Sequence, residues 1–181
     1  LSRAAPEEIE DVIRPVQHAD VKAVYLPQAL RMVKARVGDL DLHFLADLEE
    51  EPALQWLRRL RGVRTKTAAT ILNFSTLRKR TLPVDRHMLR VGKRVGFLPE
   101  HASYDTGYDM VMRRVPDHWD AETLYEFHWL VKYLSQKICT HATPDCSHCP
   151  LRDFCPSAFL GPGDGPSPTH CAAAAPASSV G

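Results

Sequence analysis

Residues 60–74 read LRGVRTKTAATILNF, a short turn that contains Gly62 followed by small and apolar residues. Leu54, Leu57 and Leu60 recur at helical spacing before the turn, so the sequence predicts two helices joined by a hairpin, the second over 65–74. A turn of this kind directs backbone N–H groups at the start of the second helix toward an anion, and a DNA phosphate fits such a site. An ordinary connection between two helices also explains these residues.

The rest of the chain also carries apolar residues at helical spacing, and no segment alternates convincingly as a strand does. The apolar stripe that ends at Gly38 places Pro27 in the first turn of its helix, where a missing N–H costs little. Asp120 is the expected cap of the last helix. The sequence therefore predicts an all-α fold, with helices around 26–37, 54–60, 65–74, 88–95, 104–115 and 124–138.

Composition divides the chain of 181 residues into three parts. We expect one helical domain over 1–80 and a second over 81–156, because the stretch 78–83 has the most linker character. From residue 157 onward Gly, Pro, Ser and Ala dominate, and we expect a disordered tail over 157–181 because so few apolar side chains cannot offset the entropy of ordering. No apolar run approaches the roughly 20 residues that span a bilayer, and the polar, acidic start is unlike a signal peptide. These features argue against a membrane protein and against a conventionally secreted one.

A strongly basic segment lies within a chain whose formal net charge is only +1. Between Arg58 and Arg94 there are twelve Lys or Arg residues and one acid, Asp85, whereas the rest of the chain carries eleven bases and twenty-one acids. A segment this basic suggests a polyanionic partner, most simply a nucleic-acid backbone. Helical faces covered with solvated Arg and Lys explain the charge about equally well.

Four of the five cysteines fall within seventeen residues, and they are Cys139, Cys146, Cys149 and Cys155. Disulfides are a poor explanation in a helical chain without an export signal. A zinc site usually pairs two C-x-x-C knuckles, and this loop has one, although His141 and His148 offer substitute ligands. Four thiolates in one compact loop favour an iron–sulfur cluster over zinc. Cys171 lies in the tail and is interpreted as a free thiol.

Two residues of the basic segment are candidates for chemistry. Lys66 falls in the first turn of the second predicted helix, where Arg61, Arg64 and the positive helix end favour its neutral, nucleophilic amine. Phosphate contact or solvation is the commoner role of such a lysine. Asp85 precedes a helix and is an expected N-cap, a role compatible with a carboxylate that stabilises positive charge on a sugar.

Together these features resemble the endonuclease III family of helix–hairpin–helix DNA glycosylases over residues 10–156. The cysteine spacing matches the family's cluster loop, C-x6-C-x2-C-x5-C, in full. The hairpin is similar to the family motif L-P-G-V-G-x-K-T-A, with Lys66 at the position of the lyase nucleophile. Residues 82–91, LPVDRHMLRV, are similar to the stretch that carries the family's catalytic aspartate, here Asp85.

The resemblance implies a fold of two helical domains with a C-terminal [4Fe–4S] cluster loop, and it implies base-excision repair. A damaged base, here expected to be an oxidised pyrimidine, is flipped out of double-stranded DNA. Lys66 displaces the base and forms a Schiff base, β-elimination nicks the strand at the abasic site, and Asp85 supports the sugar cation. The alternative is a non-catalytic iron–sulfur module that only binds DNA.

The resemblance also implies which residues bind which partner. The cluster ligands are the four loop cysteines, and the expected hairpin contacts to DNA are Gly62, Val63, Arg64, Thr65 and Thr67. The protein is expected to act as a monomer on DNA with a damaged base or an abasic site. Its compartment is the one that holds DNA, which is the cytoplasm of a bacterium or archaeon and the nucleus or an organelle of a eukaryote.

The chain departs from the family pattern at several positions. Arg64 replaces the second hairpin glycine, and we expect a distorted turn because that glycine usually adopts a conformation that is costly for other residues. Arg86 replaces a small residue, and Leu134-Ser135 stands where relatives often have His-Gly. Family members carry roughly sixty further N-terminal residues, so we expect this chain to be part of a longer protein.

Overall fold

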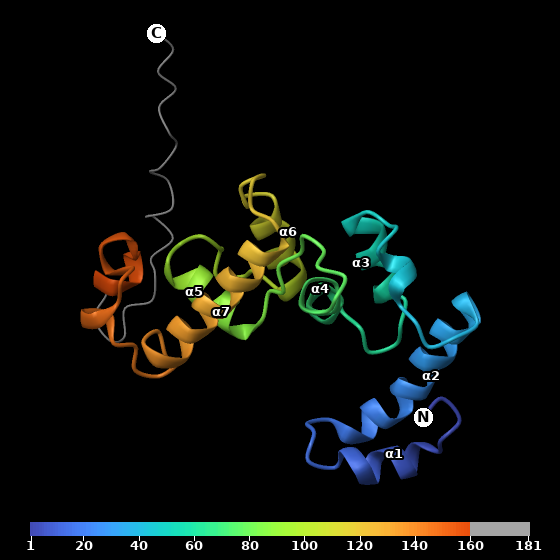
Figure 1. The fold of residues 1–181 in the computed structure, drawn as a ribbon. Helices are drawn as coiled ribbons and strands as arrows, with labels where there is room; N and C mark the ends of the chain where they lie inside the picture. The colour runs from blue at the N-terminus through green and yellow to red at the C-terminus, as the bar shows by residue number, and fades with distance from the viewer. Residues whose placement is uncertain (160–181) are drawn as a thin grey trace. The chain divides into compact units, whose positions relative to one another are not determined.

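The computed structural model describes residues 1–159, which form helices joined by short loops (Figure 1). No strand occurs in this part of the chain, which confirms the predicted all-α class. The α-helices are α1 Pro6–Ile13, α2 Ala19–Val37, α3 Glu50–Arg58, α4 Thr65–Phe74, α5 Arg86–Arg94, α6 Tyr104–Met112 and α7 Ala121–Lys137. Short 3-10 helices are η1 His43–Leu45, η2 Cys146–His148, η3 Arg152–Phe154 and η4 Pro156–Phe159.

The chain divides into two compact units. Within the described residues, unit 1 comprises 1–83 and 112–126, and unit 2 comprises 84–111 and 127–159. A boundary drawn along the sequence after residue 80 therefore differs from this division, because residues 112–126 return to the first unit. Helices α6 and α7 each contribute residues to both units.

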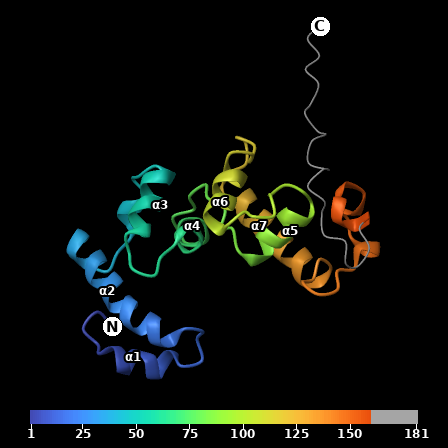
Figure 2. The same ribbon diagram turned by 180° about the vertical axis from the view of Figure 1, so that it is seen from behind.

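Unit 1 is organised as helix pairs. Helix α1 lies alongside α2 in both views (Figure 1, Figure 2), and α3 contacts α4. Leu54 and Leu57 of α3 and Leu72 of α4 are fully buried or nearly so, and each such leucine contributes about 1.5–3 kcal/mol to folding. The pairing of α3 with α4 fixes the hairpin that joins them.

Helix α2 is longer than the sequence predicted. It begins at Ala19, so Pro27 lies in its interior and is buried, and its placement in the first turn was wrong. The predicted apolar stripe did not include the first half of α2. The valines in that half, Val21 and Val24, are exposed in the structure and so do not belong to a buried face. Helix α2 ends before Gly38, as predicted; this glycine has φ +84° and donates its N–H to the Lys34 carbonyl oxygen at 2.8 Å.

Unit 2 contains α5, most of α6, most of α7 and the cysteine loop, residues 139–155. Met88 and Val91 of α5 are buried, as are Tyr108 and Val111 of α6. No helix in residues 1–159 is long and apolar enough to span a membrane.

The first residues assigned to the predicted tail, 157–159, have defined structure. Residues 157–159 belong to η4, where the Ser157 hydroxyl donates to the Arg94 carbonyl oxygen at 2.8 Å. That hydrogen bond to α5 holds a stretch that composition alone assigned to the tail. The rest of the predicted tail, Cys171 included, lies outside the described residues.

Candidate functional site

The hairpin between α3 and α4 is a tight turn built around Gly62. Its φ of +81° is a conformation that favours glycine, and the next residue, Val63, donates its N–H to the Leu60 carbonyl oxygen at 3.0 Å. A Cβ at Gly62 would lie 2.8 Å from Cδ2 of Tyr25, and Arg61 lies over the same ring at 5.0 Å. Tyr25 of α2 therefore packs directly on the hairpin and leaves no room for a side chain at Gly62.

Arg64 is the N-cap residue of α4 and does not strain the turn. Its φ of −104° and ψ of 174° are extended values that any residue adopts, so the expected distortion was wrong. Its side chain makes no capping hydrogen bond to the first turn of α4. Because a guanidinium only donates, α4 begins with N–H groups that its own N-cap side chain cannot satisfy.

Lys66 is the second residue of α4 and its side chain is exposed. Its own carbonyl oxygen accepts the Thr70 hydroxyl at 2.8 Å, one turn further along. Gly62, Arg64 and Thr67, which we predicted to contact DNA, are also exposed. Unit 1 therefore presents a lysine amine, an arginine and the start of a helix on one hairpin.

The other two hairpin residues predicted to contact DNA are less accessible. Val63 is half-buried, and Thr65 is buried. The Thr65 hydroxyl has no hydrogen-bond partner among the described residues.

Asp85 is the N-cap residue of α5 in unit 2, as the sequence predicted. Its Oδ1 accepts the backbone N–H groups of His87 at 2.8 Å and Met88 at 3.0 Å. The side chain is 8% exposed. With Oδ1 held by two N–H groups, Oδ2 is the oxygen left for chemistry.

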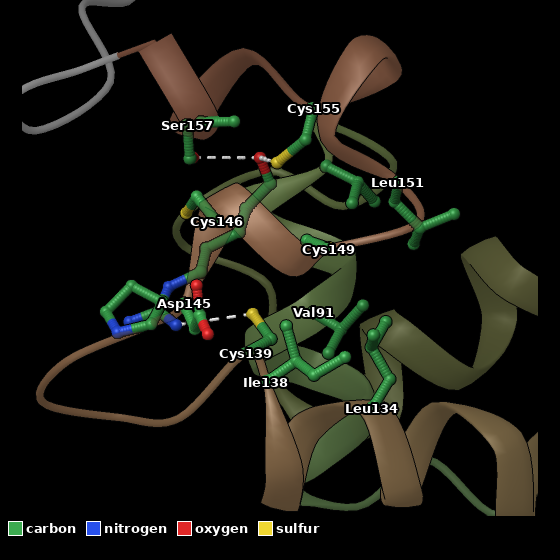
Figure 3. Close-up of a pocket in the computed structure, with 14 residues that line it drawn as sticks. Val91, Leu134, Ile138, Cys139, Asp145, Cys146, Cys149, Leu151, Cys155 and Ser157 are labelled. Atoms are coloured by element: carbon green, nitrogen blue, oxygen red, sulfur yellow. Dashed lines mark hydrogen bonds between the residues drawn. The ribbon is translucent and has the colours of Figure 1, made fainter.

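The four loop cysteines line one pocket in unit 2, together with apolar side chains (Figure 3). Each is a half-buried free thiol, and the pocket has a volume of about 60 Å³, several times the roughly 10–15 Å³ that one water needs on the same measure. Burial raises the pKa of the Cys155 thiol. The apolar lining includes Val91, Leu134, Ile138 and Leu151.

Four cysteine sulfurs are the main metal donors of this pocket, and Asp145 and Ser157 also line it. His141 and His148 are exposed and do not line it, and His148 Nδ1 instead lies 2.8 Å from Asp145 Oδ2. No three His, Cys, Asp or Glu residues within 1–159 are grouped so that they could hold a single metal ion. Four thiols around a space larger than one atom fit a polynuclear iron–sulfur cluster in the chemistry of their donors.

Known proteins similar to this chain include an endonuclease III and proteins named as DNA glycosylases. The chain is 29% identical over 155 residues to endonuclease III of Sulfolobus acidocaldarius, covering 86% of this chain and 65% of that protein. It is 30% identical over 163 residues to a candidate DNA glycosylase of Arabidopsis thaliana, covering 83% and 53%. No family model matches the chain.

Solved structures of endonuclease III share the fold. A non-covalent endonuclease III–DNA complex matches with a TM-score of 0.69 and 24% identity over 87% of this chain and 67% of that chain. A trapped covalent endonuclease III–DNA intermediate matches with a TM-score of 0.66 over the same shares. The chain is thus similar to endonuclease III in sequence and in fold. It spans between about half and two thirds of the length of the two relatives named above.

Not all of the basic residues that suggested a polyanion partner are available to DNA. Lys79 Nζ donates to the Ala46 carbonyl oxygen at 2.7 Å. Arg80 donates from Nε to the Trp119 carbonyl oxygen at 2.7 Å and from Nη2 to that of Pro116 at 2.9 Å. These bases hold loops of unit 1 together. The net charge of the segment therefore overstates the number of basic side chains that are free to bind DNA.

Sequence reasoning missed a buried histidine beside Asp85. His87 is 8% exposed, and its Nδ1 lies 2.9 Å from the Ser135 hydroxyl. In the sequence, Ser135 was evident only as a departure from the family pattern. Burial lowers the pKa of His87 most; Asp85 opposes that shift, and the Arg86 and Arg90 charges add to it. The signal available in the sequence was a histidine two residues after the candidate catalytic aspartate.

Proposed function

We propose that the protein is a base-excision DNA glycosylase with abasic-site lyase activity, acting on oxidised pyrimidines in double-stranded DNA. The observation that carries this proposal is the hairpin of unit 1, where exposed Lys66 lies in the first turn of a helix whose N-cap is a cation. The similarity to endonuclease III and to DNA glycosylases supports it.

In the proposed reaction the hairpin binds DNA through phosphate. The N–H groups at the start of α4 and the Arg64 guanidinium attract the phosphate oxygens. Gly62, Thr65 and Thr67 supply backbone contacts in the same turn. This grip holds the strand while a damaged base leaves the stack.

Lys66 is the proposed nucleophile. Its neutral Nζ forms a bond to the sugar C1′, and the glycosidic C–N bond breaks with its electron pair leaving on the base, which takes up a proton. Opening of the sugar ring yields a Schiff base on Nζ. Loss of a C2′ proton then expels the 3′ phosphate with its electron pair, and water releases Lys66.

Asp85 has the proposed electrostatic role. A carboxylate stabilises the positive charge that develops on the sugar as the base departs. Its attachment to the start of α5 through Oδ1 holds the carboxylate in one orientation, which is the preorganisation that such a role requires.

We infer that Cys139, Cys146, Cys149 and Cys155 hold a [4Fe–4S] cluster. When bound, this group orders the loop that carries its ligands. The four cysteines that line one pocket, with His141 and His148 outside it, support the inference over zinc. Purified protein is expected to show visible iron–sulfur absorbance and equal amounts of iron and acid-labile sulfide, whereas zinc in colourless protein would contradict it.

The test of the proposed reaction is borohydride trapping on an abasic-site duplex, using the protein at the full length that its gene encodes. Wild type is expected to form a covalent adduct, and Lys66→Gln none, while both bind the duplex. Lys93→Gln is the matched control, because it removes the same charge from a residue with no role in the mechanism. Wild-type protein that holds its cluster and binds DNA without forming an adduct would instead indicate the binding module.

A further inference from the structure

Arg94, the last residue of α5, contacts the first cysteine of the loop through its side chain. Nη1 donates to Cys139 Sγ at 3.3 Å and to the Thr140 carbonyl oxygen at 2.6 Å. Nη2 donates to the His141 carbonyl oxygen at 2.9 Å. One guanidinium therefore contacts three consecutive residues where the loop begins.

The backbone of Arg94 contacts the other end of the loop. Its carbonyl oxygen accepts the Cys155 thiol at 3.3 Å and the Ser157 hydroxyl at 2.8 Å. In Figure 3 the dashed lines from Cys155 and Ser157 converge on this oxygen. Arg94 also lines the pocket that the four cysteines surround. Arg94 therefore contacts both ends of the loop. The Ser157 hydroxyl keeps its hydrogen bond to this oxygen when Cys155 is a thiolate ligand, whereas the Cys155 hydrogen bond requires the thiol proton.

We propose that Arg94 is a positioning residue for the iron–sulfur cluster: it holds both ends of the cysteine loop and places a fixed positive charge against the Cys139 sulfur. This inference rests on the proposed function, because it requires that the loop holds the cluster. An N–H bond from a permanently charged guanidinium to a thiolate ligand stabilises that anion. Hydrogen bonds and charge at the ligand sulfurs also raise the reduction potential of a cluster.

The neighbouring basic residues do not share this geometry. Arg90 donates from Nε to the Cys139 carbonyl oxygen at 3.0 Å and from Nη2 to the Ser135 carbonyl oxygen at 2.8 Å and to the Ser135 hydroxyl, so none of these hydrogen bonds reaches a cysteine sulfur. Lys93 does not line the cysteine pocket. Lysine at position 94 would keep the charge but lose the planar fork that reaches several acceptors at once.

The experiment compares Arg94→Gln, Arg94→Lys and the charge-matched control Lys93→Gln with wild type in the cluster-loaded, full-length protein. One readout is the rate at which a chelator removes iron, followed by the decay of visible absorbance. The other is the midpoint potential of the cluster by voltammetry. Neither readout depends on DNA or on turnover.

Arg94→Gln is expected to lose iron about 10- to 100-fold faster than wild type and to have a lower midpoint potential. Lys93→Gln is expected to match wild type in both. Arg94→Lys is expected to lose iron faster while keeping most of the potential, and it carries the test if Arg94→Gln does not fold. Equal behaviour of the position-94 variants and Lys93→Gln would overturn the role of Arg94.

Failure of the proposed function gives a different result. Wild-type protein without iron or labile sulfide would overturn the cluster itself, before any variant is compared. A cluster-loaded wild type whose iron release and potential are insensitive to position 94 would leave the cluster in place and remove only this inference.

Discussion

Helices α4 and α5 begin with nearly the same backbone and opposite side chains. The N-cap residue of α4, Arg64, has φ −104° and ψ 174°, and that of α5, Asp85, has φ −105° and ψ −175°. Asp85 accepts two N–H groups from the first turn of its helix, whereas Arg64 accepts none. At the start of α5 the backbone N–H groups have a carboxylate acceptor from the chain itself. At the start of α4 the N-cap side chain is a cation, which cannot accept a hydrogen bond.

The difference shows how one local geometry serves two purposes. A helix N-terminus carries partial positive charge and unsatisfied N–H groups, which an anion stabilises. At α5 the anion is part of the chain and is held in place for chemistry. At α4 the anion has to come from outside, and in our proposal it is a DNA phosphate.

Asp85→Asn is the sharpest test of the α5 side of this comparison. Asparagine caps a helix about as well as aspartate, so we expect the free energy of unfolding to stay close to that of wild type. We expect single-turnover base removal from an oxidised-pyrimidine duplex to slow about 100-fold or more, because the carboxylate charge is lost. An unchanged rate would reduce Asp85 to a structural cap.

Gly62→Ala tests the turn that presents the start of α4. The left-handed conformation costs alanine about 1 kcal/mol, and its Cβ would collide with Tyr25, for a total loss of about 2–3 kcal/mol in the free energy of unfolding. Gly38→Ala is the control, because Gly38 has a similar φ of +84° and nothing within 4 Å of an added Cβ. If urea unfolding gave the same loss of unfolding free energy for Gly62→Ala and Gly38→Ala, the Tyr25 ring would be able to move aside without cost.

Arg64→Asp reverses the comparison by giving α4 the cap that α5 has. We expect a gain of about 0.5–1 kcal/mol in the free energy of unfolding and a loss of about tenfold or more in affinity for an abasic-site duplex. Arg64→Gln is expected to lower the salt slope of binding by about one. Arg80→Gln is expected to leave that slope unchanged and to lower stability, since Arg80 bonds carbonyl groups of unit 1. An Arg64→Asp variant that binds DNA as wild type does would refute the phosphate role of this helix start.

The smallest expected effect concerns His87, next to the α5 cap. Its pKa is lowered in the folded protein, mainly by burial, so it should titrate below the ordinary histidine value of 6.5 when followed by NMR. The unfolded chain then takes up this proton first, so His87 makes stability decrease as the pH falls through 6.5. Arg86→Gln should raise the pKa of His87 slightly, because the Arg86 charge lowers it. A His87 that titrates above 6.5 would contradict burial as the main influence on its pKa.

Local features of the fold followed from the sequence, and contacts between distant residues did not. The bounds of α4, the end of α2 at Gly38 and the cap at Asp85 depend on residues within a few positions of one another. The missed features depend on long-range contacts, such as Arg80 with Trp119, 39 residues away, and His87 with Ser135, 48 residues away. Charge counted along a sequence does not distinguish a base that binds a loop carbonyl from one that faces a ligand.

The sequence predicted the candidate residues of unit 2 more fully than those of unit 1. The spacing of the cysteines was enough to group them, because one short loop brings all four to the same pocket. The consequence of Arg64 was predicted wrongly, because the motif alone does not give the backbone conformation of its second glycine position. The hydrogen bonds between Arg94 and the cysteine loop join residues 45 or more positions apart, so no sequence spacing indicated them.

The role of Lys66 as nucleophile is tested by peptide mapping by mass spectrometry of wild-type protein trapped with borohydride on an abasic-site duplex. We expect the sugar remnant on the peptide that carries Lys66, attached at Lys66 itself. A remnant on another lysine or on the N-terminal amine, or the absence of any adduct from protein that binds the duplex, would contradict it.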